Sequence, residues 1–202
     1  MTEPKKLHQV ILEWTGRKTL EQTHLPTFMV GNINPKFEVR PYQKLGLQYF
    51  LNYWEESFDG KPRQNHQLLF HMATGSGKTM MMACLILYLY SKGYRNFLFF
   101  VNSTNIINKT KDNFLNPNSS KYLFSDTISI GDKRVAIRQV NDFQSASQDD
   151  INIVFTTIQG LHYDLSHPSE NKITYDDFQD KKTVLISDEA HHIRSGRVCL
   201  NR

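Results

Sequence analysis

Cysteine and long apolar runs are both scarce in this chain. It has two cysteines in 202 residues, Cys84 and Cys199, and neither has the spacing of a metal site. The longest apolar run covers residues 80–90, which is too short to cross a bilayer. No signal peptide is visible at the N-terminus. These absences exclude a zinc site built on cysteines and a transmembrane helix, and they favour a cytoplasmic protein with free thiols.

The remaining composition is that of an ordinary globular domain, with 39% hydrophobic and 22% charged residues. The net charge of +4 permits a polyanionic partner without demanding one. The length predicts one domain, residues 35–202, preceded by an N-terminal extension, residues 1–34, that contains Pro26. This extension is either a docking arm for a partner or a segment packed on the domain, and we favour the second.

One stretch predicts a phosphate-binding loop between a strand and a helix. Residues 68–72 predict a buried β-strand, residues 73–79 a glycine-rich loop, and residues 80–90 a buried helix. Glycine lets backbone N–H groups approach an anion, and a helix N-terminus adds partial positive charge. Lys78 can reach the β- and γ-phosphates of ATP, and the Thr79 hydroxyl can bind Mg²⁺. The predicted nucleotide-binding residues here are Thr74, Gly75, Ser76, Gly77, Lys78, Thr79 and Met80.

An acidic pair follows another predicted strand. Residues 183–187 are apolar enough for a buried strand and run directly into Asp188 and Glu189. Because ligands in open α/β sheets sit at the carboxyl ends of strands, we expect this pair to lie near the glycine loop. Asp188 would then hold Mg²⁺, and Glu189 would orient and deprotonate the attacking water. Taken alone, such a pair is equally compatible with a solvated loop.

These motifs carry a family resemblance. Residues 73–79, ATGSGKT, and residues 188–191, DEAH, resemble motifs I and II of superfamily 2 helicases and translocases. Residues 40–43 are similar to the adenine-reading segment of that superfamily, which implies that Gln43 contacts adenine; spacing alone indicates only an exposed helical glutamine. Residues 35–195 resemble the motor subunit of type III restriction endonucleases more than that of type I. The resemblance also implies that His191 couples hydrolysis to movement.

Polar residues also follow two further predicted strands. Residues 96–101 and 151–155 predict buried strands. By resemblance, the residues that follow them touch a nucleic-acid backbone, namely Asn102, Ser103, Thr104, Thr156 and Thr157. Short hydroxyl and amide groups can bind phosphate without reading sequence. Ser103 is equally suited to cap the following helix, and both roles can hold at once.

The fold class implied is α/β, a single RecA-like P-loop domain. We expect the four buried strands to be neighbours in a mostly parallel sheet with helices on both faces. A helix should begin at Pro41, short strands should lie within residues 122–130 and 135–140, and residues 161–178 should form a loop and a short helix. The histidines do not form a zinc pattern.

The function implied by the resemblance is an ATP-hydrolysing motor domain that moves along double-stranded DNA with Mg²⁺. We expect it to be the first half of a motor, with a second RecA-like domain and a modification or specificity subunit as partners. Arg194 and Arg197 follow the acidic motif and are expected to be surface residues. Two alternatives stay open: the ATPase domain of another superfamily 2 helicase acting on DNA or RNA, and a non-catalytic nucleotide-binding fragment.

Overall fold

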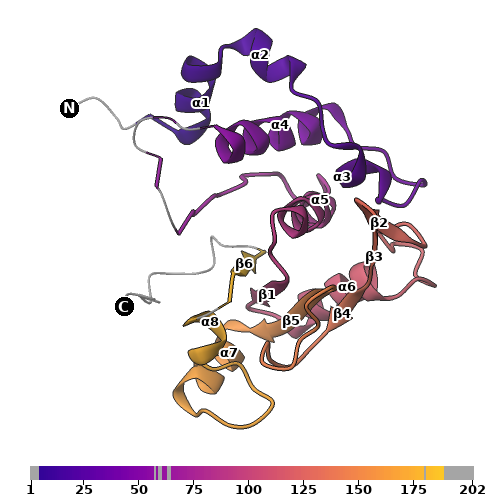
Figure 1. Ribbon diagram of the computed structural model, residues 1–202, viewed down its shortest axis with the longest axis vertical. Coiled ribbons are helices and arrows are strands. Elements are labelled where there is room, and N and C mark those ends of the chain that lie inside the picture. Colours follow the sequence, from indigo (N-terminus) through magenta and orange to yellow (C-terminus); the bar gives the residue numbers. More distant parts are fainter. Residues whose placement is uncertain (1–4, 57, 59–60, 63–64, 180, 189–202) are drawn as a thin grey trace.

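A parallel β-sheet forms the centre of the chain. The computed structural model describes residues 5–56, 58, 61–62, 65–179 and 181–188. Its main sheet is four-stranded, in the order β4 (Ile137–Gln139), β5 (Ile151–Thr157), β1 (Asn96–Val101) and β6 (Thr183–Ser187) (Figure 1). All three pairings are parallel. A separate antiparallel pair joins β2 (Ile128–Ile130) to β3 (Lys133–Val135). The predicted α/β class with a mostly parallel sheet is therefore confirmed.

Helices cover both faces of this sheet. On one face, Phe97, Phe99 and Val101 of β1 are buried in the same cluster as α4 (Pro41–Glu55), α5 (Lys78–Ser91) and α6 (Thr104–Leu115). On the other face, Leu98 and its β5 neighbour Val154 pack with side chains of α7 (Ile158–Ser166) and α8 (Asp176–Gln179). Alternate side chains of β1 thus point to opposite faces of the sheet, and both faces are buried. This is why the sequence of the strand is a continuous apolar run.

The N-terminal helices pack on the domain. Helices α1 (Leu7–Thr15) and α2 (Arg17–Gln22) contact α4, and α3 (Thr27–Gly31) contacts α5. Leu20 and Met29 are almost completely buried in these contacts. The Gln48 side chain of α4 donates to the carbonyl oxygens of Glu21 and Thr23 at 3.1 and 2.9 Å, which fixes the end of α2. The division of the chain at residue 34 stays a prediction.

The predicted strand at residues 68–72 is wrong. These residues form neither strand nor helix, so β6 is an edge strand of the sheet. Within the segment, the Phe70 ring contacts Phe50 of α4, and just before it His66 Nδ1 lies 2.9 Å from the Tyr53 hydroxyl oxygen. A strand needs a hydrogen-bonded neighbour, and here aromatic contacts with α4 hold the chain instead. Figure 1 shows this segment as a coil that leads into α5.

The other predicted elements lie close to their expected positions. Strands β1 and β6 have the predicted bounds, whereas β5 extends through Thr156 and Thr157. Helix α4 begins at Pro41 as expected, and α5 begins earlier than predicted, at Lys78. Cys84 is buried in α5, and burial raises the pKa of its thiol to about 12. Among the helices that the structure describes, none has the length and hydropathy needed to span a membrane.

Candidate functional site

The carboxyl ends of three strands meet at one edge of the sheet. The β1–β5 register pairs Val101 with Thr157, and the β1–β6 register pairs Phe100 with Ser187. The polar residues that follow β1 and the Asp188 that follows β6 therefore emerge at the same edge. The predicted catalytic residue Glu189 and the predicted coupling residue His191 lie outside the residues that the structure describes.

The glycine loop presents open backbone donors. Gly75 and Gly77 have φ values of +76° and +82°, a left-handed conformation that residues with a Cβ rarely adopt. Within the described part of the chain, the N–H groups of Gly75, Gly77, Lys78 and Thr79 donate no hydrogen bond. Lys78 and Thr79 also begin α5, so the helix dipole adds partial positive charge at these donors. The arrangement is suited to an anion.

Helix α4 holds this loop in place. The Tyr42 hydroxyl donates to the Ser76 carbonyl oxygen at 2.9 Å, and Gln43 Nε2 donates to the same oxygen at 3.0 Å. Gln43 Oε1 in turn accepts the Arg40 N–H at 2.9 Å, which fixes the orientation of the amide. Gln43 is only 3% exposed, so the exposed glutamine suggested by helical spacing alone is wrong. The contribution of Tyr42 was not predicted from the sequence.

Some hydrogen-bond donors of the loop are paired with a carbonyl oxygen of the loop itself. The Ala73 carbonyl oxygen accepts from Ser76 N–H at 3.3 Å, from Ser76 Oγ at 2.6 Å and from Lys78 Nζ at 3.4 Å. The Lys78 ammonium group therefore folds across the loop. An anion bound by the open amides would compete with Ala73 for both side chains, since each can rotate away from a single carbonyl.

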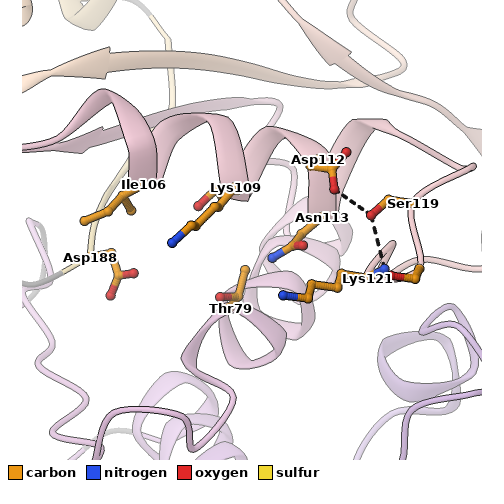
Figure 2. A pocket seen from close by; sticks show the side chains of 10 residues that line it. Thr79, Ile106, Lys109, Asp112, Asn113, Ser119, Lys121 and Asp188 are labelled. Atoms are coloured by element: carbon orange, nitrogen blue, oxygen red, sulfur yellow. Dashed lines mark hydrogen bonds between the residues drawn. The ribbon is translucent and has the colours of Figure 1, made fainter.

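A cavity of about 390 Å³ lies beside the loop and brings Thr79 and Asp188 together (Figure 2). One hydroxyl and one carboxylate are hard oxygen ligands of the kind Mg²⁺ prefers. The described residues contain no group of three His, Cys, Asp or Glu side chains able to enclose a metal. Thr79 and Asp188 therefore fit a magnesium ion that completes its shell with phosphate and water.

Further polar residues of this cavity were not predicted from the sequence. They come from one face of α6, where Lys109, Thr110 and Asn113 recur at helical spacing beside the apolar Ile106, and from the segment that contains Lys121. The Ser103 cap fixes the start of α6, so helical periodicity could have placed these residues on one face. Nothing in the sequence indicated that this face meets Thr79.

The predicted nucleic-acid residues cluster at the same sheet edge, and two of them cap helices. Ser103 Oγ accepts the Asn105 N–H at 3.3 Å at the start of α6. Thr157 Oγ1 accepts the Gly160 N–H at 2.9 Å at the start of α7. The predicted capping role of Ser103 is confirmed. Asn102 and Thr104 are exposed beside it, so their side chains are accessible to a partner.

Comparisons with known proteins agree with this geometry. Residues 36–199 match the family described as "Type III restriction enzyme, res subunit". The chain is 46% identical over 185 residues to the "Probable type III restriction-modification enzyme HindVIP Res subunit" of Haemophilus influenzae. That alignment covers 87% of this chain and 35% of the relative, so the chain spans about a third of the relative's length. No solved structure matches the chain. The chain therefore belongs to the family of Res subunits of type III restriction enzymes.

Proposed function

We propose that this chain binds ATP with Mg²⁺ and is the first half of an ATP-hydrolysing motor that moves along double-stranded DNA. The observation that carries the proposal is the glycine loop, whose open N–H groups meet the N-terminus of α5. Membership of the Res family supports a helicase-like motor. DNA translocation and restriction are proposals for a whole Res subunit, because the chain spans about a third of its relative's length.

Each part of the nucleotide has a proposed partner. The N–H groups of residues 75–79, flanked by Thr74 and Met80, bind the β- and γ-phosphates, and Lys78 leaves the Ala73 carbonyl to join them. Thr79 and Asp188 would hold Mg²⁺, which neutralises charge that develops on the phosphates. Gln43 contacts the adenine edge through its amide, which requires it to exchange its bond to the Ser76 carbonyl.

Hydrolysis then needs a positioned water. We assign Glu189 as the base that accepts a proton from this water, whose oxygen bonds to the γ-phosphorus. The bond from that phosphorus to the bridging oxygen of ADP breaks, and ADP keeps its electron pair. His191 is proposed to couple this step to movement. The charge clamp on the far side of the phosphates is proposed to come from a second RecA-like domain.

The remaining partners follow from the family. We propose that exposed groups at the carboxyl ends of β1 and β5 contact the DNA backbone, and that a modification or specificity subunit selects the DNA site. The setting is proposed to be the cytoplasm. An RNA helicase would show stimulation of its ATPase by RNA rather than by duplex DNA. A non-catalytic fragment would bind nucleotide, yet the longer protein would show no turnover.

The test is nucleotide binding by the 202-residue chain, measured by calorimetry with Mg²⁺ and ADP or a slowly hydrolysed ATP analogue. We expect Lys78→Ala to abolish measurable binding of the ATP analogue, because it removes the cation nearest the β- and γ-phosphates. The matched control is Lys18→Ala, an exposed lysine on α2. Equal affinity of the wild type and Lys78→Ala would contradict the proposal.

A further inference from the structure

The cavity beside Thr79 extends beyond the groups assigned to the nucleotide. Its volume of about 390 Å³ exceeds what one magnesium ion needs. On the side of Thr79 and Asp188 it borders the proposed metal and phosphate position. On the opposite side it is bounded by α6 and by residues 119–121. A small ligand that left the γ-phosphate position could therefore pass into this space without crossing the loop.

Two ammonium groups enter this cavity. Figure 2 shows the Lys109 side chain descending from α6, and the Lys121 side chain extending toward Thr79 from the segment after α6. Neither lysine forms an ion pair with any residue of the described ranges, whereas Lys92 and Lys133 are paired at 2.6 and 2.8 Å. Both lysines are exposed, and Lys121 has a Coulombic interaction with Asp112 without forming an ion-pair contact. An anion between the two ammonium groups would be attracted to both.

Neutral donors complete the lining. Asn113 projects from the same face of α6 as Lys109, and Figure 2 shows it between Lys121 and Thr79. Thr110 lies on this face too and is only 3% exposed. Amide and hydroxyl donors beside ammonium groups are the usual partners of a phosphate ion, which offers several acceptor oxygens.

Two carboxylates, Asp112 and Asp188, also line the cavity. Hydrogen bonds from Ser119 Oγ at 2.6 Å and from Asn116 Nδ2 at 2.7 Å hold the pKa of the Asp112 carboxyl below its usual range. Figure 2 shows the Asp112 carboxylate directed at Ser119, its hydrogen-bond donor. Asp188 would have its charge offset by Mg²⁺ under the proposed function.

We propose that this cavity is a holding site for inorganic phosphate, bound by the ammonium groups of Lys109 and Lys121. The inference rests on the proposed function, because hydrolysis of ATP supplies the phosphate beside Thr79. Once its bond to ADP is broken, the ion carries between one and two negative charges at neutral pH and is free to move. The two lysines stabilise it away from ADP, so its departure from the cavity becomes a separate step from cleavage.

The experiment measures binding of inorganic phosphate to the chain in the presence of Mg²⁺ and saturating ADP, by phosphorus NMR titration. We expect Lys109→Gln and Lys121→Gln each to weaken phosphate binding about tenfold, as loss of one hydrogen bond to a charged group would. Lys109→Arg should retain binding because it keeps the charge. The matched control is Lys111→Gln, which lies on α6 but over the Phe155 ring, 5.5 Å from its centroid.

The same variants separate this inference from the proposed function. If the wild type binds no ADP, the proposed function fails. If ADP binds normally and phosphate affinity is unaffected by both lysine variants, the holding site is overturned while the nucleotide site stands. A slowly hydrolysed ATP analogue shows whether the lysines bind free phosphate or the γ-phosphate that is still attached to the nucleotide. If Lys109→Gln and Lys121→Gln weaken the analogue as much as inorganic phosphate, the lysines grip the attached γ-phosphate and the holding site is likewise overturned.

Discussion

Gly77 and Gln43 lie so close that a Cβ on residue 77 would stand 2.4 Å from Gln43 Nε2. Real Cβ atoms do not approach that near, so glycine is needed at this position for space as well as for its φ of +82°. Gly75, at φ +76°, has nothing within 4 Å of the corresponding point. The two loop glycines therefore share a backbone requirement, and only Gly77 also makes room for α4.

Alanine substitutions should separate these two requirements. We expect Gly75→Ala to lower the free energy of unfolding by about 1–2 kcal/mol, the cost of a left-handed residue with a Cβ. Gly77→Ala should cost about 1–3 kcal/mol more, because Gln43 must also move. Urea unfolding of the chain gives both values.

The control is the same pair of substitutions in a Gln43→Ala background, where the amide is absent. There the costs of Gly75→Ala and Gly77→Ala should become equal. If Gly77→Ala still lowers the free energy of unfolding more than Gly75→Ala does, another contact, and not Gln43, limits the space at this position.

Gln43 also has a predicted effect on base preference. If its amide leaves the Ser76 carbonyl to contact adenine, the wild type should bind ADP more tightly than GDP, and Gln43→Ala should erase that difference. Calorimetry with both nucleotides measures the preference. If Gln43→Ala lowers the affinities for ADP and GDP by the same factor, Gln43 acts only by holding the loop. The matched variant is Gln144→Ala, an exposed glutamine outside α4.

A third prediction concerns pH. The Glu55 carboxylate at the end of α4 lies 2.6 Å from Lys92 Nζ and accepts the Tyr88 hydroxyl. The hydrogen bond from Lys92, followed by that from Tyr88, lowers the pKa of Glu55 below its ordinary value of 4.5. A lowered folded-state pKa stabilises the fold above the unfolded pKa, and this contribution is lost as the pH falls through the folded pKa.

Glu55→Gln should therefore reduce the free energy of unfolding at neutral pH, by about 1 kcal/mol or less because the pair is partly exposed. The difference from wild type should shrink as the pH falls below 4.5. Glu170→Gln is the control, because Glu170 is exposed and forms no ion pair in the described part of the chain. A difference that stays constant across this pH range would assign the effect to packing.

The sheet was predictable in part because β1 and most of β5 are buried, whereas β6 is only partly buried and its Leu185 is 45% exposed. Strands β1 and β6 are short apolar runs followed by polar residues, and their predicted bounds match the structure. The segment at residues 68–72 has a similar composition but lacks a neighbouring strand in the structure. Local sequence does not specify hydrogen-bonding partners, and the contacts of Phe70 and His66 with α4 come from residues far away in the sequence.

Those parts of the candidate site that depend on local sequence were likewise predictable. The glycines at positions 75 and 77 indicated a loop whose N–H groups can approach an anion, because glycine carries no Cβ, and both are left-handed in the structure. The Tyr42 contact with this loop and the meeting of Lys109 with Thr79 depend on how helices α4, α5 and α6 pack. Packing joins residues that no local spacing relates, so these contacts required the structure.

The last prediction concerns nucleic acid at the ends of β1 and β5. Ser103 caps α6, whereas the adjacent Thr104 is exposed and has no capping role. If this edge binds the DNA backbone, Thr104→Ala should weaken binding of duplex DNA about tenfold without changing stability, as loss of one hydrogen bond to a charged phosphate would. Ser103→Ala should also lower the free energy of unfolding by about 1 kcal/mol, because it removes a cap. Fluorescence anisotropy and urea unfolding measure the two effects.

Two duplexes of unrelated sequence make this test specific. Hydrogen bonds to phosphate carry no base information, so Thr104→Ala should weaken both duplexes equally, and binding of both should fall as salt is raised. Thr127→Ala is the control, since Thr127 is exposed beside β2 and away from the carboxyl ends of β1 and β5. A loss confined to one duplex would mean that this edge reads bases. If Thr104→Ala leaves the binding of both duplexes unchanged, the DNA path does not cross the end of β1, and Ser103 serves only to begin α6.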